Sequence, residues 1–105
     1  MYDKINKGEQ TACKRLVRIL LNKGYKLSVY DGEDWQVLRS TDEVAIIDAL
    51  GNTDMDTVQV NSDGFFKGSF MLVWGNAEDG SELIADHTDN PFCNDVWETW
   101  AGIND

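Results

Sequence analysis

One segment in the second half of the chain decides the fold: Phe66-Lys67-Gly68-Ser69-Phe70-Met71-Leu72-Val73-Trp74. Apolar side chains occupy alternate positions in it, and towards its end the positions between them, Met71 and Val73, are apolar as well. A strand that is apolar on both sides is typical of the interior of a sheet. The segment therefore predicts a long interior strand with other strands on both sides of it.

Four other segments carry strand signals and are bounded by turn residues: Lys26–Asp31, Asp34–Arg39, Met55–Val60 and Glu82–Asp86. The loop Asp31-Gly32-Glu33-Asp34 joins the first two as a hairpin, and Asn61-Ser62-Asp63-Gly64 turns the third into the long strand. The run from Gly75 to Gly80 leads out of the long strand. Short connections favour antiparallel neighbours, because parallel pairs require long crossovers.

Three helices are predicted from apolar residues that recur every three or four positions. The first covers about Glu9–Lys23 and stops at Gly24; its apolar stripe comprises Ala12, Cys13, Leu16, Val17, Leu20 and Leu21. The second starts at Ser40, where Ser40 and Glu43 fit a capping box, and ends at Gly51; its apolar side comprises Val44, Ile46, Ile47 and Leu50. The third covers about residues 91–101, with Asn90 as N-cap and Pro91 in the first turn; its stripe comprises Phe92, Cys93, Val96, Trp97 and Trp100.

The order of these elements predicts an α+β fold: a five-stranded, mostly antiparallel sheet with three helices packed on one face, in the order αββαβββα. A length of 105 residues predicts a single domain, residues 1–105. Such a chain buries roughly 65% of its unfolded surface, which suffices for one core. No apolar run approaches the ~18–20 residues that cross a bilayer, and no secretory signal is recognisable, so we expect a soluble cytoplasmic protein without a membrane partner.

The charge of the chain is divided unevenly along its length. Residues 1–30 sum to +5 and residues 31–105 sum to −15, which gives the formal net charge of −10. The basic side chains gather on the first helix, and the acidic ones follow the sheet and its loops. Such a negative field restricts the partners that the protein can meet.

Catalytic signatures are absent from the sequence, and we expect no enzyme. His87 is the single histidine, so a small enzyme would have to centre on His87 and Cys93. The alternative is a hydrogen-bonded or exposed histidine in the loop before the last helix. The two cysteines, Cys13 and Cys93, are expected to be buried free thiols, because a bridge between them requires that the two helices touch and is unusual in a reducing cytosol.

Metal and cofactor sites are not expected either. Asn52, Asp54 and Asp56 offer oxygen ligands at alternate positions, with Asp63 twelfth in the count, but Thr57 stands where a calcium loop needs glycine. One histidine and two separated cysteines do not form a zinc set. The glycines do not match the motifs that cradle phosphate.

The acidic residues at loops and strand ends are the candidate binding site. In a meander, alternate loops lie at the same end of the sheet, so some of these clusters should converge. Carboxylates spaced like phosphates can occupy the basic groove of a nucleic-acid-binding protein, and electrostatic steering would speed the encounter. The other interpretation is that acidic side chains keep a small domain soluble. The candidate residues are Asp31, Glu33, Asp34, Asp54, Asp56, Glu78, Asp79 and Glu82.

The basic side of the first helix carries Lys14, Arg15 and Arg18. Three cations on one helix form a weak phosphate-binding footprint in a molecule of this net charge. We expect them to pair with the chain's own acids or with an acidic partner, and we expect no direct contact with nucleic acid.

Several short motifs together resemble a set of small acidic proteins encoded in bacteriophage and prophage genomes: Ser28–Trp35, Arg39–Asp42, Thr53–Thr57, Val73–Asn76 and Ile84–Asn90. The resemblance covers about Gly24 to Asn90. It implies a context in which small accessory proteins inhibit host defence or modulate host enzymes by binding, and it carries over no catalytic residue. Acidic anti-restriction and anti-CRISPR proteins that imitate DNA share only the style and charge of this chain, which is an analogy.

Two functions from different classes follow from these patterns. The first is a non-enzymatic, phage-type acidic binding protein that docks on the basic, nucleic-acid-binding surface of a host protein. The alternative is a structural or assembly module that acts through an apolar homodimer interface, suggested by Trp35, Trp74, Trp97 and Trp100. The protein is expected to be a monomer or a homodimer.

Overall fold

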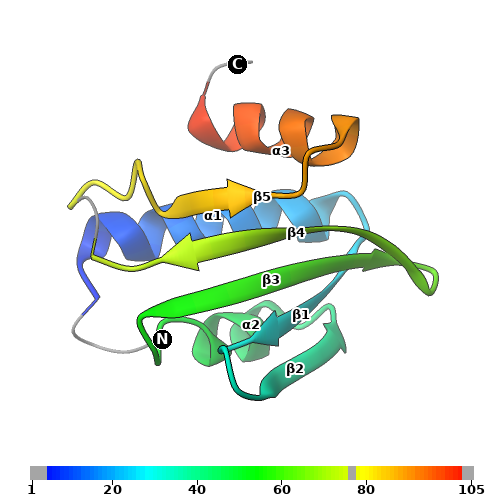
Figure 1. Ribbon diagram of the computed structural model, residues 1–105, viewed down its shortest axis with the longest axis horizontal. Coiled ribbons are helices and arrows are strands. Elements are labelled where there is room, and N and C mark those ends of the chain that lie inside the picture. The colour runs from blue at the N-terminus through cyan, green and yellow to red at the C-terminus, as the bar shows by residue number, and fades with distance from the viewer. Residues whose placement is uncertain (1–4, 76–77, 103–105) are drawn as a thin grey trace.

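The computed structural model describes residues 5–75 and 78–102, and it confirms the α+β fold (Figure 1). Asn76 and Ala77, in the predicted connection after the long strand, lie outside the described residues. The five strands form one antiparallel sheet in the order β2-β1-β3-β4-β5. The elements in chain order are α1 (Lys7–Asn22), β1 (Lys26–Tyr30), β2 (Trp35–Ser40), α2 (Glu43–Ala49), β3 (Met55–Ser62), β4 (Phe65–Val73), β5 (Ile84–His87) and α3 (Pro91–Ala101).

The long strand predicted from Phe66–Trp74 is β4, and it lies inside the sheet with β3 and β5 on either side. Its Phe70 pairs with Val58 of β3, which in turn pairs with Val29 of β1. All three side chains have no exposed surface, because this row faces the helices. Truncating a buried Phe to Ala costs about 3–5 kcal/mol, so this row anchors the core.

The helices cover one face of the sheet, as predicted. Figure 1 shows α1 and α2 behind the sheet. Helix α3 packs on the same side, because the Trp100 indole Nε1 donates to the Ala12 carbonyl of α1 at 2.8 Å. Gly68 of β4 permits this packing: a Cβ there would lie 2.3 Å from Cys93 Sγ, and the φ of Gly68 is +151°. Both Cys13 and Cys93 are buried free thiols.

Helix α1 begins at Lys7, two residues before the predicted start. Asn6 is its N-cap: the Asn6 Oδ1 accepts from the Glu9 N–H at 2.8 Å, and the Asn6 Nδ2 donates to Glu9 Oε1 at 2.7 Å. This pair differs from a capping box in its second bond, because Glu9 accepts from the Asn6 side-chain amide and not from the backbone N–H of Asn6.

The predicted capping box at the start of α2 is wrong. Asp42 is the N-cap, and its Oδ1 accepts from the N–H groups of Val44 and Ala45. Ser40 is the last residue of β2 and bonds the Asp42 N–H outside the helix. The resulting helix is short. Ile46 and Leu50 lie in the core, whereas Val44, which was predicted on the apolar side, is 68% exposed.

The β3–β4 hairpin also departs from the predicted alternation. The register shifts between Val60 and Asn61, so Phe66 no longer follows Gly68 and Phe70 into the core. Phe66 is 56% exposed as a result. The third helix matches its prediction, with Asn90 as N-cap and Pro91 in the first turn.

Candidate functional site

The strand order brings the acidic loops to one end of the sheet. In an antiparallel sheet of this order, β1 and β4 end where β2, β3 and β5 begin. The connections β1–β2, α2–β3 and β4–β5 therefore meet at the end seen on the left of Figure 1. These connections carry the candidate residues, and we call this region the acidic end: Asp31, Glu33, Asp34, Asp54, Glu78, Asp79 and Glu82.

Backbone contacts join these loops into one surface. The Thr53 hydroxyl lies 3.4 Å from the Asp31 carbonyl oxygen, and the Trp74 N–H donates to the Asp54 carbonyl at 3.1 Å. Beyond Trp74, Gly8 of α1 packs against the backbone of Glu78 and Asp79 so closely that a Cβ at Gly8 would collide with it. The three predicted clusters thus lie around one end, and their side chains are exposed except Asp31, which is half-buried, and Asp56, which is buried.

Asp31 organises the first of these loops. Its Oδ1 accepts from the N–H groups of Glu33 (2.9 Å) and Asp34 (2.8 Å), and its Oδ2 accepts from Gln36 Nε2 (2.8 Å). The bonds from the Asp34 and Glu33 backbone lower the pKa of Asp31, because hydrogen bonds to a carboxylate favour its charged form. Asp31 therefore fixes the hairpin turn and remains charged, while Glu33 and Asp34 point outward.

Asp56 does not belong to the exposed surface on which it was predicted. It is 1% exposed, because its position in β3 faces the core beside Val58. Its Oδ2 accepts from the Gly51 N–H (2.9 Å) and from the Trp74 indole Nε1 (2.8 Å), while its Oδ1 has no hydrogen-bond partner among the described residues. Burial raises the pKa of Asp56, and this effect is larger than the opposite effect of the two hydrogen bonds from Gly51 and Trp74.

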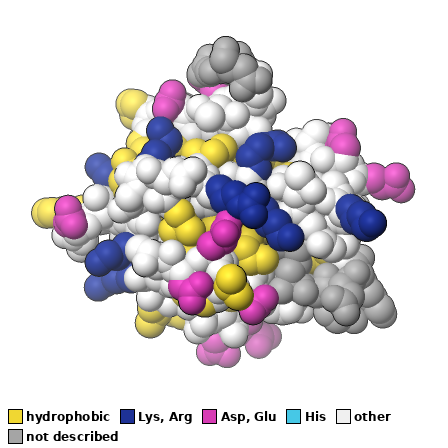
Figure 2. Space-filling model, turned by 180° about the vertical axis from the view of Figure 1, so that it is seen from behind, with side chains coloured by type: hydrophobic (Ala, Val, Ile, Leu, Met, Phe, Trp, Pro, Cys, Tyr) yellow, Lys and Arg dark blue, Asp and Glu magenta, His cyan; other side chains and the backbone are white. Residues whose placement is uncertain are grey.

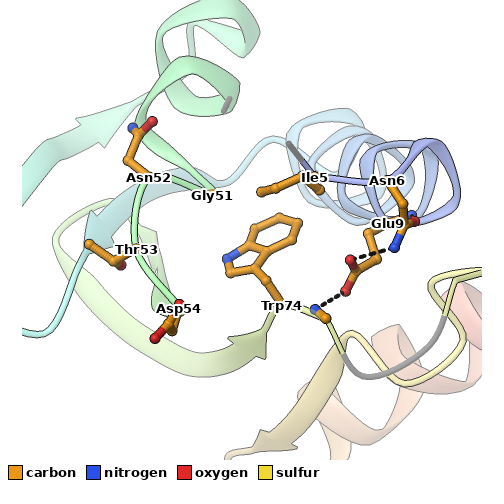
Figure 3. A pocket seen from close by; sticks show the side chains of 9 residues that line it. Ile5, Asn6, Glu9, Gly51, Asn52, Thr53, Asp54 and Trp74 are labelled. Carbon is orange, nitrogen blue, oxygen red and sulfur yellow. Dashed lines mark hydrogen bonds between the residues drawn. The ribbon is translucent and has the colours of Figure 1, made fainter. Parts of the chain in front are cut away.

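A pocket of about 370 Å³ opens at the centre of the acidic end (Figure 3). It lies between the start of α1, the loop Gly51–Asp54 and Trp74, and Figure 3 shows the indole ring between Ile5 and that loop. Glu9 forms part of its wall and is itself 2% exposed, because its Oε2 accepts from the Gly75 N–H at 2.7 Å. A second groove of about 340 Å³ adjoins it, lined by Asp31, Glu33, Thr53, Asp54 and Met55.

Of the residues that line this pocket, sequence reasoning singled out Asp54 as a candidate binding residue, but it did not predict the cavity. The turn residues Gly51, Asn52 and Thr53 and the segment Trp74–Gly75 carry no motif that indicates a cavity. The one available signal is the spacing of Asn6 and Glu9, which fits a capping pair and would have placed the start of α1 here.

The basic side of α1 is partly neutralised within the molecule. Figure 2 shows Lys and Arg side chains grouped on the helix side, with apolar and acidic side chains beside them. Arg18 pairs with Glu43 of α2 at 2.6 Å. Arg15 Nε donates to the Trp100 carbonyl at 3.0 Å, and its guanidinium lies 5.4 Å from the Trp100 ring centroid. Two of the three cations thus hold helices together.

His87 and Cys93 occupy structural positions. The His87 ring lies against Phe70 (5.9 Å between centroids) and Trp97 (6.2 Å), and its Nδ1 is 3.0 Å from the Thr88 carbonyl oxygen. Cys93 is buried against Gly68, and burial raises the pKa of its thiol. Within residues 5–75 and 78–102, no hydrogen bond joins His87 to Cys93.

The side of the sheet away from the helices carries a second group of side chains, which we call the open face: Tyr30, Trp35, Met55 and Met71. Tyr30 and Met71 both pair with Thr57, and the rings of Tyr30 and Trp35 are 5.1 Å apart. Trp35 is 45% exposed, Met55 46% and Met71 37%. Trp74 and Trp97 are only partly buried, and Trp100 is 2% exposed.

Comparisons with protein-family models, with curated proteins and with solved structures find no match for this chain. Among residues 5–75 and 78–102, none of the helices is both long and apolar enough to pass through a bilayer.

Proposed function

We propose that this protein is a non-enzymatic binding protein whose acidic end occupies the basic, nucleic-acid-binding surface of another protein. The observation that carries the proposal is the convergence of three acidic loops, distant in sequence, on one end of the sheet. Solubility alone requires no such convergence, since carboxylates spread evenly over the surface would serve it equally well.

Hydrogen bonds within two of the loops of the acidic end support the same function. The Asp31 hydrogen bonds fix the first loop, and the Ser81 N–H bonds the Asp79 carboxylate at 2.9 Å in the third. A surface that is ordered before binding loses less conformational entropy when a partner docks on it. Carboxylates held in place can therefore imitate the fixed phosphates of a nucleic acid.

The resemblance to small acidic phage proteins suggests the identity of the partner. A host defence complex that binds nucleic acid, such as a CRISPR or restriction complex, presents a basic groove of the required charge. Occupation of that groove would block the nucleic acid without any chemical step, and the complex would form in the host cytoplasm.

A displacement experiment tests the proposal. Proteins from a host lysate are bound to double-stranded DNA on a resin, and the acidic protein is added at low ionic strength. We expect it to release a specific DNA-binding protein that the same low-salt buffer without the acidic protein leaves on the resin. Poly-glutamate at the same total charge is the control for non-specific competition.

Two charge-matched variants sharpen the test. Glu33→Gln/Asp34→Asn/Asp54→Asn removes three of the seven charges of the acidic end and leaves Asp31 and Asp56, whose carboxylates hold the backbone. Asp63→Asn/Asp89→Asn/Asp95→Asn removes the same charge from exposed positions on the hairpin, the β5–α3 connection and α3. Loss of release in the first variant alone supports the proposal. Equal release by both variants, or by poly-glutamate, refutes it.

The open face favours a second candidate function, assembly of two copies through apolar surface. Trp35, Met55 and Met71 remain exposed on a sheet face that the helices leave uncovered. Exposed apolar groups of this kind mark interfaces when they are contiguous. Sedimentation of the wild type and of Trp35→Ser/Met71→Ser at high protein concentration tests this function. A dimer that the variant loses supports it, and a monomeric wild type excludes it.

A further inference from the structure

The pocket beside Trp74 has the features of a site for a single positively charged side chain. We propose that it binds an arginine or lysine side chain of the partner, with the aliphatic part against Ile5 and Trp74 and the cationic head at Asp54. The proposal rests on the proposed function, and it identifies the pocket as the place where the acidic end contacts a basic side chain of the partner.

The charge of the lining selects a cation. Asp54 and Glu9 contribute carboxylates, and no Lys or Arg is among the described residues that line the pocket. The side chain of Asp54 is exposed, and among residues 5–75 and 78–102 no donor bonds its carboxylate, so both oxygens can accept from a ligand. At the start of α1, the Glu9 N–H could otherwise attract an anion, but it already donates to Asn6 Oδ1. An anionic ligand would also meet the surrounding carboxylates.

The apolar part of the lining fits the aliphatic portion of the same side chain. In Figure 3 Ile5 lies beside the Trp74 indole, and the polar residues Asn52, Thr53 and Asp54 lie on the other side of the ring. Lysine and arginine present the same combination, an apolar stem and a charged head. Indole is also the aromatic group that attracts cations most strongly.

The position of the indole ring is fixed from below by Asp56. The Asp56 Oδ2 binds Trp74 Nε1 and the Gly51 N–H together, so one buried carboxyl group joins two walls of the pocket. The backbone N–H of Trp74 donates to the Asp54 carbonyl, which ties the carboxylate wall to the aromatic wall. Asp56 is therefore a positioning residue for the pocket and makes no contact with the ligand.

The size of the cavity sets the scale of the ligand. About 370 Å³ is near the lower limit of the pockets that hold small molecules, and this pocket is open to solvent. One side chain projecting from a protein surface can enter it and leave room for water, whereas a free organic ligand in so open a pocket would keep much of its own surface in water.

A titration with a minimal probe tests the proposal. ¹⁵N-labelled protein is titrated with N-acetyl-arginine amide and, as the neutral isostere, with N-acetyl-citrulline amide, and the Trp74 indole N–H and the amides of Gly51 and Asn52 are followed by NMR. We expect saturable shifts at these three groups with arginine and at most a tenth of the response with citrulline. Asp54→Asn should weaken arginine binding about tenfold, the loss expected for one charge-assisted hydrogen bond. The matched control Asp63→Asn, on the β3–β4 turn, should change it less than about twofold, as expected for a charge separated from the ligand by more than the Debye length.

Three results would overturn the proposal: equal shifts with citrulline and arginine, shifts spread over the acidic loops without the Trp74 indole, and equal effects of Asp54→Asn and Asp63→Asn. The test is independent of the displacement experiment. Displacement that depends on the acidic end, together with no arginine binding at Trp74, rejects the pocket and keeps the proposed function. Arginine binding without displacement keeps the pocket and rejects the function.

Discussion

Replacement of Asp56 by Asn provides the most discriminating test of the structure beneath the acidic end. The carboxyl group is 1% exposed, and one of its oxygens has no donor among the described residues. Asn retains an acceptor for the Gly51 N–H and the Trp74 indole but places an amide donor where the unpartnered oxygen lies. A buried polar group without a partner costs about 1–3 kcal/mol. We expect Asp56→Asn to lower the free energy of unfolding by about 1–2 kcal/mol at pH 4.

The difference in unfolding free energy between the wild type and Asp56→Asn, here called the deficit of the variant, depends on pH through the pKa of Asp56. Burial raises this pKa above its ordinary value of 3.8, and the Asp31 carboxylate adds to the effect. The folded state thus binds the Asp56 proton more tightly than the unfolded state does, so the wild type loses stability as pH rises from 3.8 through the folded pKa. Asn does not titrate. The deficit of the variant should therefore be largest near pH 4 and shrink towards pH 7.

Urea unfolding of both proteins, followed by circular dichroism between pH 4 and pH 7.5, measures this difference. The slopes of unfolding free energy against urea should agree between wild type and variant, so that midpoints report stability. A deficit that grows with pH would refute the reasoning, since it would mean that the two donors stabilise the Asp56 anion more than burial disfavours it.

Three other substitutions or reactions have defined outcomes. Gly68→Ala should lower the unfolding free energy by about 2–4 kcal/mol, because its Cβ meets Cys93 Sγ, and Cys93→Ala should restore part of the loss; Gly64→Ala, in open space at a φ of +86°, is the control for the strain of a positive φ without a contact. Arg15→Ala should cost about 1 kcal/mol by releasing the Trp100 carbonyl and ring, measured by thermal unfolding. Burial raises the pKa of Cys13 to about 12, so neither thiol should react with iodoacetamide at pH 8 before urea is added; rapid labelling of the native protein would contradict the buried positions.

The elements whose pattern is local could be predicted from the sequence. The alternation around Phe70 and the stripe around Leu16 depend only on the period of a strand or a helix, and both segments form the predicted elements with buried side chains. Asn90 and Pro91 likewise mark the start of α3 by chemistry confined to one turn.

The remaining features depend on contacts between distant segments. Strand alternation alone places Asp56 on the same face as Val58 and Val60, but only the pairing of β3 with β4 brings its carboxyl group to the Trp74 indole. The exposure of Phe66 results from a register shift that the hairpin sequence does not predict. The convergence of the acidic loops could be anticipated from an antiparallel order, but the pocket between them could not, because it requires the start of α1 to lie beside Gly75.

The association rate of the displaced DNA-binding protein tests the central claim most directly. It is measured against the wild type, Glu33→Gln/Asp34→Asn/Asp54→Asn and Asp63→Asn/Asp89→Asn/Asp95→Asn at two ionic strengths. Because steering depends on where the charges lie, we predict that the first variant associates about tenfold or more slowly at low salt and that the second stays near the wild-type rate. Equal slowing of both variants would show that only net charge matters, and it would contradict a binding site at the acidic end.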